Sequence, residues 1–237
     1  MSLEDARVEL VQAGRILFGM EIVDAFGHVS RRHPDRPDRF LMSCSKAQGL
    51  LEVGDIVEHD LDGEAVSRQG VRLFLERFIH GEIYRARPDV GAVVHSHCFS
   101  VLPFTVVAEA RLRPISHVCG FLAGVGRPFD VADHEGASTD LLIRTPQLGR
   151  ALAAHLGDSK VVLMRGHGFT AVGENVPQAV FRAVYTGVNS QIQSTAAQLG
   201  DARFLSAEEA AACERTTLSQ IGRVWELWVR KYGGAAL

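Results

Sequence analysis

Apolar residues recur at the spacing of an α-helix in several long stretches of the chain. The first stretch predicts an amphipathic helix over residues 3–19, with apolar positions at Leu3, Val8, Val11, Ile16 and Leu17. The same spacing predicts helices over residues 72–87, 140–156, 175–200 and 206–232, and a shorter one over residues 99–107. Asn175 and Ser206 favour the N-cap position, so two of these helices have a defined start.

Short apolar runs between the helical segments predict β-strands. They cover residues 24–30, 39–43, 55–60, 92–97, 114–118, 160–164 and 168–172, with residues 124–130 as a loop or a further short strand. Residues 33–38 are rich in Pro and Asp, and a turn there pairs the first two strands antiparallel. We find no internal repeat or linker. The pattern therefore predicts one α/β domain over residues 1–237 with a mostly antiparallel central sheet.

The strand predicted over residues 92–97 ends in a pair of histidines. Ala92, Val93 and Val94 lead directly into His95 and His97. Side chains two residues apart on a strand share a face, so the two rings can meet at one cation. A His-x-His pair also occurs by chance in purely structural roles. Neutral imidazole binds Zn, Mn, Fe and Ni alike, so the pair selects no metal.

Two further residues favour a metal site over a structural pair. His167 directly follows another apolar run, and Glu76 lies in the helix predicted over residues 72–87, on one face with His80. A catalytic metal takes about three protein ligands and leaves a position open for substrate. His95, His97 and His167 can supply three, with Glu76 as a fourth ligand or as a base.

Composition narrows the classes of partner. The 237 residues are 46% hydrophobic and 22% charged, which is typical of a globular protein. A net charge of -3 gives no electrostatic case for nucleic acid or an anionic membrane, so we expect a small-molecule ligand. No apolar run reaches the ~20 residues of a membrane helix, and the N-terminus lacks a signal-peptide pattern, so a cytoplasmic location is expected. Four widely spaced cysteines suggest neither a disulfide framework nor a zinc knuckle.

Several motifs, taken in order, resemble the class II aldolase/adducin family. They are Gly27-His28-Val29-Ser30, Ser43-x-Ser45, Glu76-x-x-x-His80, the tract from Arg87 to His97, and Gly166-His167-Gly168. The resemblance spans roughly residues 5 to 200. It implies a three-layer αβα fold, usually tetrameric, with active sites at subunit boundaries. It also implies a divalent metal held by His95, His97 and His167, with Glu76 as acid/base or as part of the metal shell.

The sequence departs from the sugar-phosphate aldolases of this family at the motifs that bind phosphate. Those enzymes have small hydroxyl residues before the acidic residue and an asparagine where His28 stands here. The matching stretch is Arg72-Leu73-Phe74-Leu75-Glu76. Arg72 can grip a carboxylate through two parallel hydrogen bonds, and with His28 and Ser45 it makes a cationic pocket for an aromatic acid. A solvated charge for Arg72 and a turn histidine for His28 are the structural alternatives.

The pattern is most similar to the decarboxylase branch of the family, which acts on 3-hydroxy-2-methylpyridine-4,5-dicarboxylate or 3,4-dihydroxyphthalate. This resemblance implies metal-dependent, non-oxidative decarboxylation of a hydroxylated aromatic or pyridine dicarboxylate. The metal chelates the hydroxyl and carboxylate oxygens and stabilises the negative charge left when CO2 departs. Mn2+ is favoured, while Zn2+, Fe2+ and Co2+ suit the same ligands.

Catalytic and substrate-binding roles remain to be distributed among the other candidates. Proton transfer is expected from His28, Glu76 or His117, with the first two as the catalytic candidates. Substrate binding is expected from the four residues Arg72, Ser43, Ser45 and His117; the last has a buried structural histidine as its alternative reading. Two other functions stay open: a class II aldolase or epimerase acting on a sugar phosphate or small hydroxy-carbonyl compound, and a non-catalytic adducin-like interaction module.

Overall fold

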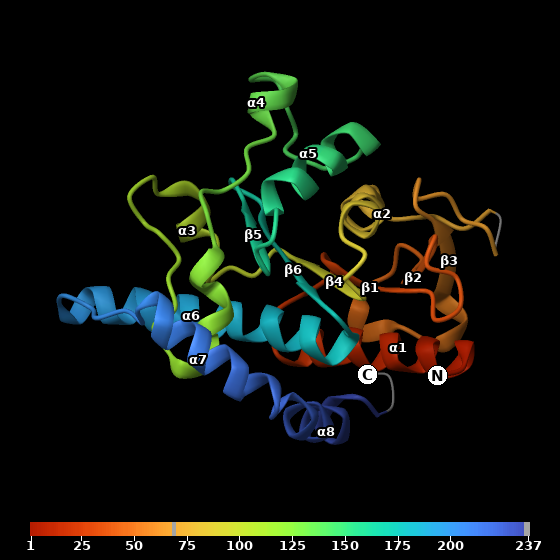
Figure 1. The fold of residues 1–237 in the computed structure, drawn as a ribbon. Helices are drawn as coiled ribbons and strands as arrows, with labels where there is room; N and C mark the ends of the chain where they lie inside the picture. The colour runs from red at the N-terminus through yellow and green to blue at the C-terminus, as the bar shows by residue number, and fades with distance from the viewer. Residues whose placement is uncertain (68–69, 235–237) are drawn as a thin grey trace.

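A six-stranded sheet forms the centre of the computed structural model, which describes residues 1–67 and 70–234 (Figure 1). Every pair of neighbouring strands is antiparallel. The spatial order is β3-β2-β1-β4-β6-β5. The strands are β1 (His28–Arg32), β2 (Arg39–Ser43), β3 (Ile56–Asp60), β4 (Ala92–Ser96), β5 (Val161–Met164) and β6 (Gly168–Gly173). The predicted mostly antiparallel sheet is confirmed.

Helices cover both faces of this sheet (Figure 1). On one face lie α1 (Leu3–Gly19), α6 (Val176–Leu199) and α8 (Ile221–Tyr232), and on the other α2 (Arg77–Ala86) and α5 (Pro146–Leu156). Successive side chains of β4 point to opposite faces of the sheet, so Val94 packs in the core on the first face and Val93 in the core on the second. The result is the predicted three-layer αβα arrangement.

Short helices complete the chain. They are the 3-10 helices η1 (Gln48–Leu50), η2 (Val53–Asp55) and η3 (His117–Gly124), and the α-helices α3 (Pro103–Val106), α4 (Ala132–Glu135) and α7 (Ala207–Leu218). The helix predicted over residues 206–232 is therefore two helices, separated at residues 219–220. Its predicted capping box, Ser206 with Glu209, is present at the start of α7. No helix within the described residues has both the length and the hydropathy needed to cross a membrane.

The strand predicted over residues 114–118 was wrong. This segment runs beside α6, whose side chains satisfy its backbone in place of a neighbouring strand. Ile115 N donates to Asn189 Oδ1 at 3.0 Å, and Asn189 Nδ2 donates to the Arg113 carbonyl at 2.8 Å. An apolar run alone does not distinguish these two ways of satisfying a backbone.

Two predicted helices begin later than their apolar spacing indicates. α2 starts at Arg77, with Glu76 at the N-cap, and α5 starts at Pro146, with the Thr145 hydroxyl accepting from Leu148 N. The residues before each helix, 72–76 and 140–145, run as loops that meet at Glu76. Glu76 therefore lies at the N-cap, one residue before the helix in which it was predicted, and the loops provide walls for a site.

Candidate metal centre

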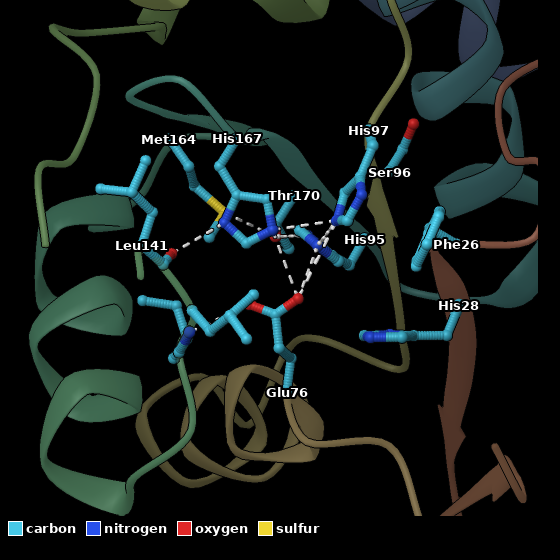
Figure 2. Close-up of polar contacts among 12 residues, drawn as sticks. Phe26, His28, Glu76, His95, Ser96, His97, Leu141, Met164, His167 and Thr170 are labelled. Atoms are coloured by element: carbon cyan, nitrogen blue, oxygen red, sulfur yellow. Dashed lines mark hydrogen bonds and ion pairs between the residues drawn. The ribbon is translucent and has the colours of Figure 1, made fainter. Parts of the chain in front are cut away.

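His95 and His97 lie at the end of β4, as the sequence predicts. Their Nε2 atoms are 2.9 Å apart (Figure 2). Ser96 points the opposite way, and its hydroxyl donates to the Ile22 carbonyl at 2.5 Å. The alternation of β4 therefore sends both imidazoles to one side and anchors the strand end on the other.

His167 is in the tight turn between β5 and β6, and this turn brings it to the same point. Its Nε2 lies 2.9 Å from His97 Nε2. Gly168 makes this approach possible: its φ of 155° is in the region that favours glycine, and an added Cβ would collide with the Ser96 carbonyl oxygen. Residues 70 positions apart in sequence thus meet because β6 packs directly against β4.

Glu76 approaches the three imidazoles from the opposite side, at the N-cap of α2 (Figure 2). Its Oε2 lies 3.3 Å from His167 Nε2, 3.4 Å from His95 Nε2 and 3.9 Å from His97 Nε2. Its other oxygen, Oε1, accepts from the Ile143 backbone N–H at 2.9 Å. One ligand atom from each of the four residues lies within 4.8 Å of all the others.

Contacts on the far side of the histidine rings help determine which nitrogen faces the candidate metal centre. His167 Nδ1 lies 3.0 Å from the Leu141 carbonyl, which can only accept, so Nδ1 carries the hydrogen and Nε2 has the free lone pair. His95 Nδ1 lies 3.3 Å from Thr170 Oγ1. The His97 ring stacks with Phe26 at 5.9 Å between centroids. Three converging nitrogens and one carboxylate form a donor set that suits a divalent cation.

The electrostatics agree with this donor set. Burial opposes ionisation of Glu76, but the three surrounding histidines outweigh it and hold its pKa well below the ordinary value. Burial lowers the pKa of His95 to about 4, despite the nearby carboxylate. Burial also lowers the pKa of His167, but the hydrogen bond and charge of Glu76 reverse this and raise it. An ionised carboxylate is therefore buried where positive charge is needed to balance it.

A cavity of about 250 Å³ opens beside this centre. Glu76 and His97 line it, together with three residues predicted from the sequence, His28, Arg72 and Ser45. The backbone holds two of them together, since Ser45 N donates to the Arg72 carbonyl at 2.8 Å. The structure thus brings the predicted cationic and hydroxyl groups next to the predicted ligands.

Two predicted substrate-binding residues do not line this cavity. Ser43 is buried at the end of β2, where its hydroxyl accepts from Gln48 Nε2 at 3.3 Å. His117 is exposed at the start of η3, so it is neither a cavity residue of this chain nor the buried structural histidine that was its alternative. Their roles in substrate binding stay predictions, because a motif match gives the residue type without the direction of the side chain.

Sequence reasoning missed several residues that shape the site. Phe26, Phe74 and Leu142 line the cavity, and the backbones of Leu141 and Ile143 hold His167 and Glu76. Phe26 left a signal, because it is a large apolar residue, 64% exposed, in a polar turn beside the His28 motif. The backbone contacts left none, since any residue type has the same N–H and C=O.

Three imidazoles and a carboxylate converge beside the end of β4, in an antiparallel sheet between two helical layers, and together they could hold a divalent metal ion. The comparison with protein families identifies the family to which the chain belongs. Residues 8–194 match the class II aldolase and adducin N-terminal domain. The chain belongs to the class II aldolase/adducin family.

The curated relatives include several decarboxylases. Decarboxylase tropJ of Talaromyces stipitatus is 43% identical over 91% of this chain and 90% of its own length. The 3,4-dihydroxyphthalate decarboxylase of Arthrobacter keyseri is 31% identical over 83% of this chain and 82% of its own. Among solved structures, an aldolase II superfamily protein from Pseudomonas syringae matches 98% of this chain and 94% of its own, at 25% identity and a TM-score of 0.78.

A sugar-phosphate aldolase shares the fold as well. L-fuculose 1-phosphate aldolase from Glaciozyma antarctica covers 96% of this chain and 89% of its own, at 21% identity and a TM-score of 0.77. Decarboxylases and class II aldolases both cleave carbon–carbon bonds. The chain is accordingly an enzyme of the carbon–carbon lyase class, with a decarboxylase or aldolase-like function and a site suited to a divalent metal.

Proposed function

We propose that this protein is a divalent-metal-dependent, non-oxidative decarboxylase of a hydroxylated aromatic or pyridine dicarboxylate. One observation carries the proposal: the cavity beside the Glu76 and histidine cluster also contains Arg72, His28 and aromatic walls. The decarboxylase names of the curated relatives support the same reaction type. Mn2+ is the favoured ion, with Zn2+, Fe2+ and Co2+ as alternatives.

The cavity has the chemistry to hold a flat diacid. Phe26 and Phe74 provide apolar faces on which an aromatic ring can stack. Arg72, at the same cavity, can pair with the carboxylate that is retained. The serine at position 45 adds a hydroxyl there, whereas the hydroxyl-rich stretch expected for a phosphate is absent from residues 72–76.

His95, His97, His167 and Glu76 are the residues that would hold the cation. The ion supplies Lewis-acid chemistry, which stabilises negative charge as the carbon–carbon bond breaks. Glu76 stays ionised in this setting, and its Oε1 is fixed by Ile143 N–H, so Oε2 is the oxygen free to bind the ion or take a proton. His28, whose ring centroid lies 5.1 Å from that of His95, is the second group within reach of a bound substrate.

Carbon dioxide release tests the proposal directly. The purified protein should release CO2 from ortho-hydroxy aromatic and pyridine diacids, lose this activity with a chelator, and regain it with Mn2+. A chelated sample without added metal controls for spontaneous decarboxylation. No turnover over a panel of such acids, with metal content verified, would contradict the proposal.

The second candidate is a class II aldolase or epimerase, favoured by the fold match to L-fuculose 1-phosphate aldolase. Faster cleavage of sugar phosphates than of aromatic acids would establish it. A non-catalytic adducin-like module is the third, and the convergence of four ligand atoms argues against it. Purified protein that fails to bind any divalent ion would favour the module.

We also propose that the protein assembles as a homotetramer. Large apolar side chains lie exposed near the cavity, including Phe26 and Phe99, at 64% and 77% exposure. A subunit contact there would bury them and help close the cavity. Light scattering at micromolar concentration should give about four times the monomer mass, and a monomer at that concentration would contradict the assembly.

A further inference from the structure

A chain of four hydrogen-bonded side chains runs from the cavity wall into the core. His28 Nδ1 lies 2.7 Å from His80 Nε2, and His80 Nδ1 lies 2.6 Å from Ser30 Oγ. Ser30 Oγ in turn lies 2.7 Å from the Tyr84 hydroxyl. All four residues are at most 3% exposed, and only His28 lines the cavity. Buried polar groups are costly unless bonded, so each hydrogen in this chain has a preferred acceptor.

The far end of the chain sets its direction. Burial raises the pKa of Tyr84, so the phenol keeps its hydrogen. Among the residues that the structure describes, Ser30 Oγ is the side-chain partner of the Tyr84 hydroxyl, and a buried hydroxyl hydrogen needs an acceptor. The hydrogen of Tyr84 is left to point at Ser30 Oγ.

This direction determines which of the next side chains donates and which accepts in each hydrogen bond. Ser30 accepts from Tyr84 and donates its own hydrogen to His80 Nδ1. His80 Nε2 and His28 Nδ1 face each other at 2.7 Å, so a single hydrogen lies between the two rings. With its Nδ1 accepting, His80 carries its hydrogen on Nε2 and donates it to His28 Nδ1.

We propose that Tyr84, Ser30 and His80 are positioning residues that hold His28 as its Nε2–H tautomer, so that its ring presents a hydrogen-bond donor to the substrate cavity. Nδ1 faces the core, so Nε2 lies on the other side of the ring. The ring extends from β1 toward the space beside Glu76 and His95 (Figure 2). The partner of this donor is an anionic oxygen of the substrate, a carboxylate or a phenolate.

This inference divides the roles of the two catalytic candidates. A neutral His28 with its hydrogen on Nε2 cannot accept a proton there, which leaves Glu76 as the base. His28 instead stabilises negative charge on a substrate oxygen as the reaction proceeds. The contribution of His28 to turnover rests on the proposed decarboxylation, whereas its tautomer in the resting protein does not.

Nitrogen NMR of the protein with 15N-labelled histidine rings tests the tautomer directly. Spectra are recorded at neutral pH before and after addition of diamagnetic Zn2+, and the His28 signals are assigned by their loss in His28→Gln. We expect a protonated Nε2 and a bare Nδ1 for His28. A protonated Nδ1 on His28 would overturn the proposal.

Tyr84→Phe tests the origin of the tautomer, with Tyr185→Phe as the matched control. Tyr185 loses the same hydroxyl on α6, where its ring packs with Phe181 and Trp228. Without the phenol hydrogen, Ser30 can accept from His80 instead, so the Nδ1–H tautomer of His28 should appear. Ser30→Ala breaks the chain at a second point and should give the same signal, which covers a Tyr84→Phe protein that does not fold.

Activity provides the second readout. We expect kcat to fall about tenfold in Tyr84→Phe with KM changed less, as for loss of one hydrogen bond worth ~1.4 kcal/mol, and to stay at the wild-type value in Tyr185→Phe. Identical His28 signals in wild type, Tyr84→Phe and Ser30→Ala would overturn the proposal. If no diacid is decarboxylated but the wild-type and variant tautomers are as expected, the proposed function fails and the inference about His28 stands.

Discussion

At the scale of single residues, a contact on the far side of each ring decides what the ring can bind. His167 can present a lone pair to the centre because the Leu141 carbonyl takes its Nδ1 hydrogen. Glu76 can present one oxygen because Ile143 N–H occupies the other. Both supports come from the loop before α5, so the loop positions the donors without contributing a side chain to them.

Removal of His167 should therefore weaken metal binding. His167→Ala removes one of the four groups that would hold the cation. Loss of a contact that merely supports a ligand already weakens binding at metal sites, so we expect this variant to bind Mn2+ at least ~100-fold more weakly. Calorimetric titration and metal analysis measure it. His134→Ala, at an exposed histidine of α4, is the control. An Mn2+ affinity of His167→Ala equal to that of the wild type would rule out its role as a ligand.

Arg72 should act on binding of the diacid. Arg72→Lys keeps the charge but loses the two parallel hydrogen bonds, and Arg72→Gln loses both. We expect KM for a diacid to rise about tenfold in the first and further in the second, since hydrogen bonds to charged groups contribute ~1.5–3 kcal/mol. Steady-state kinetics measures this, with Arg230→Gln on the exposed face of α8 as control. Equal KM values in all four proteins would refute the assignment.

At the scale of elements, the close packing of β6 on β4 determines whether the centre can form. Gly168→Ala places a methyl group against the Ser96 carbonyl and in an unfavourable φ region. We expect it to lower the free energy of unfolding by ~2 kcal/mol or more and to weaken metal binding as well. Urea titration and calorimetry measure the two effects. Gly126→Ala, where an added Cβ has open space, should change neither.

The elements also show what the sequence can and cannot predict. The helix over residues 3–19 was predicted because burial on one face leaves a helical period, and the strands around His95 and His167 because burial on both faces leaves a short apolar run. The late starts of α2 and α5 were missed, since contacts between the two loops outweigh the local preference of residues 72–76 and 140–145. The four candidate metal donors were predicted from residue type and motif, and the structure brings them together, but the directions of Ser43 and His117 depend on packing that no local pattern encodes.

At the scale of the whole molecule, buried neutral histidines make stability depend on pH. Burial lowers the pKa of His59 to about 4, and that of His80 well below its ordinary value. The unfolded chain, with histidine pKa values near 6.5, binds these protons first. Stability is therefore full above about pH 6.5 and is lost as the pH falls toward the folded-state value.

Protonation of His59 alone should lower the free energy of unfolding by about 2 kcal/mol between pH 7.5 and pH 5, because the pKa of this histidine is lower in the folded than in the unfolded chain. His59→Phe keeps a ring stacked on Phe40 and removes the titrating group. We expect urea unfolding of this variant to show a shallower decline over that range. His155→Phe, at an exposed histidine of α5, should decline as steeply as wild type. Equal slopes for all three proteins would exclude a contribution from His59.

The positions of the four candidate ligands along the sequence determine when the site can form during biosynthesis. The donors at residues 76, 95, 97 and 167 meet only when β6 lies against β4, and β6 ends at Gly173. A chain emerging from the ribosome must expose all of β6 before the four residues can bind one ion together. Metal would then bind late in synthesis, only after β6 has joined the sheet, and a truncated product without β6 would not bind the ion.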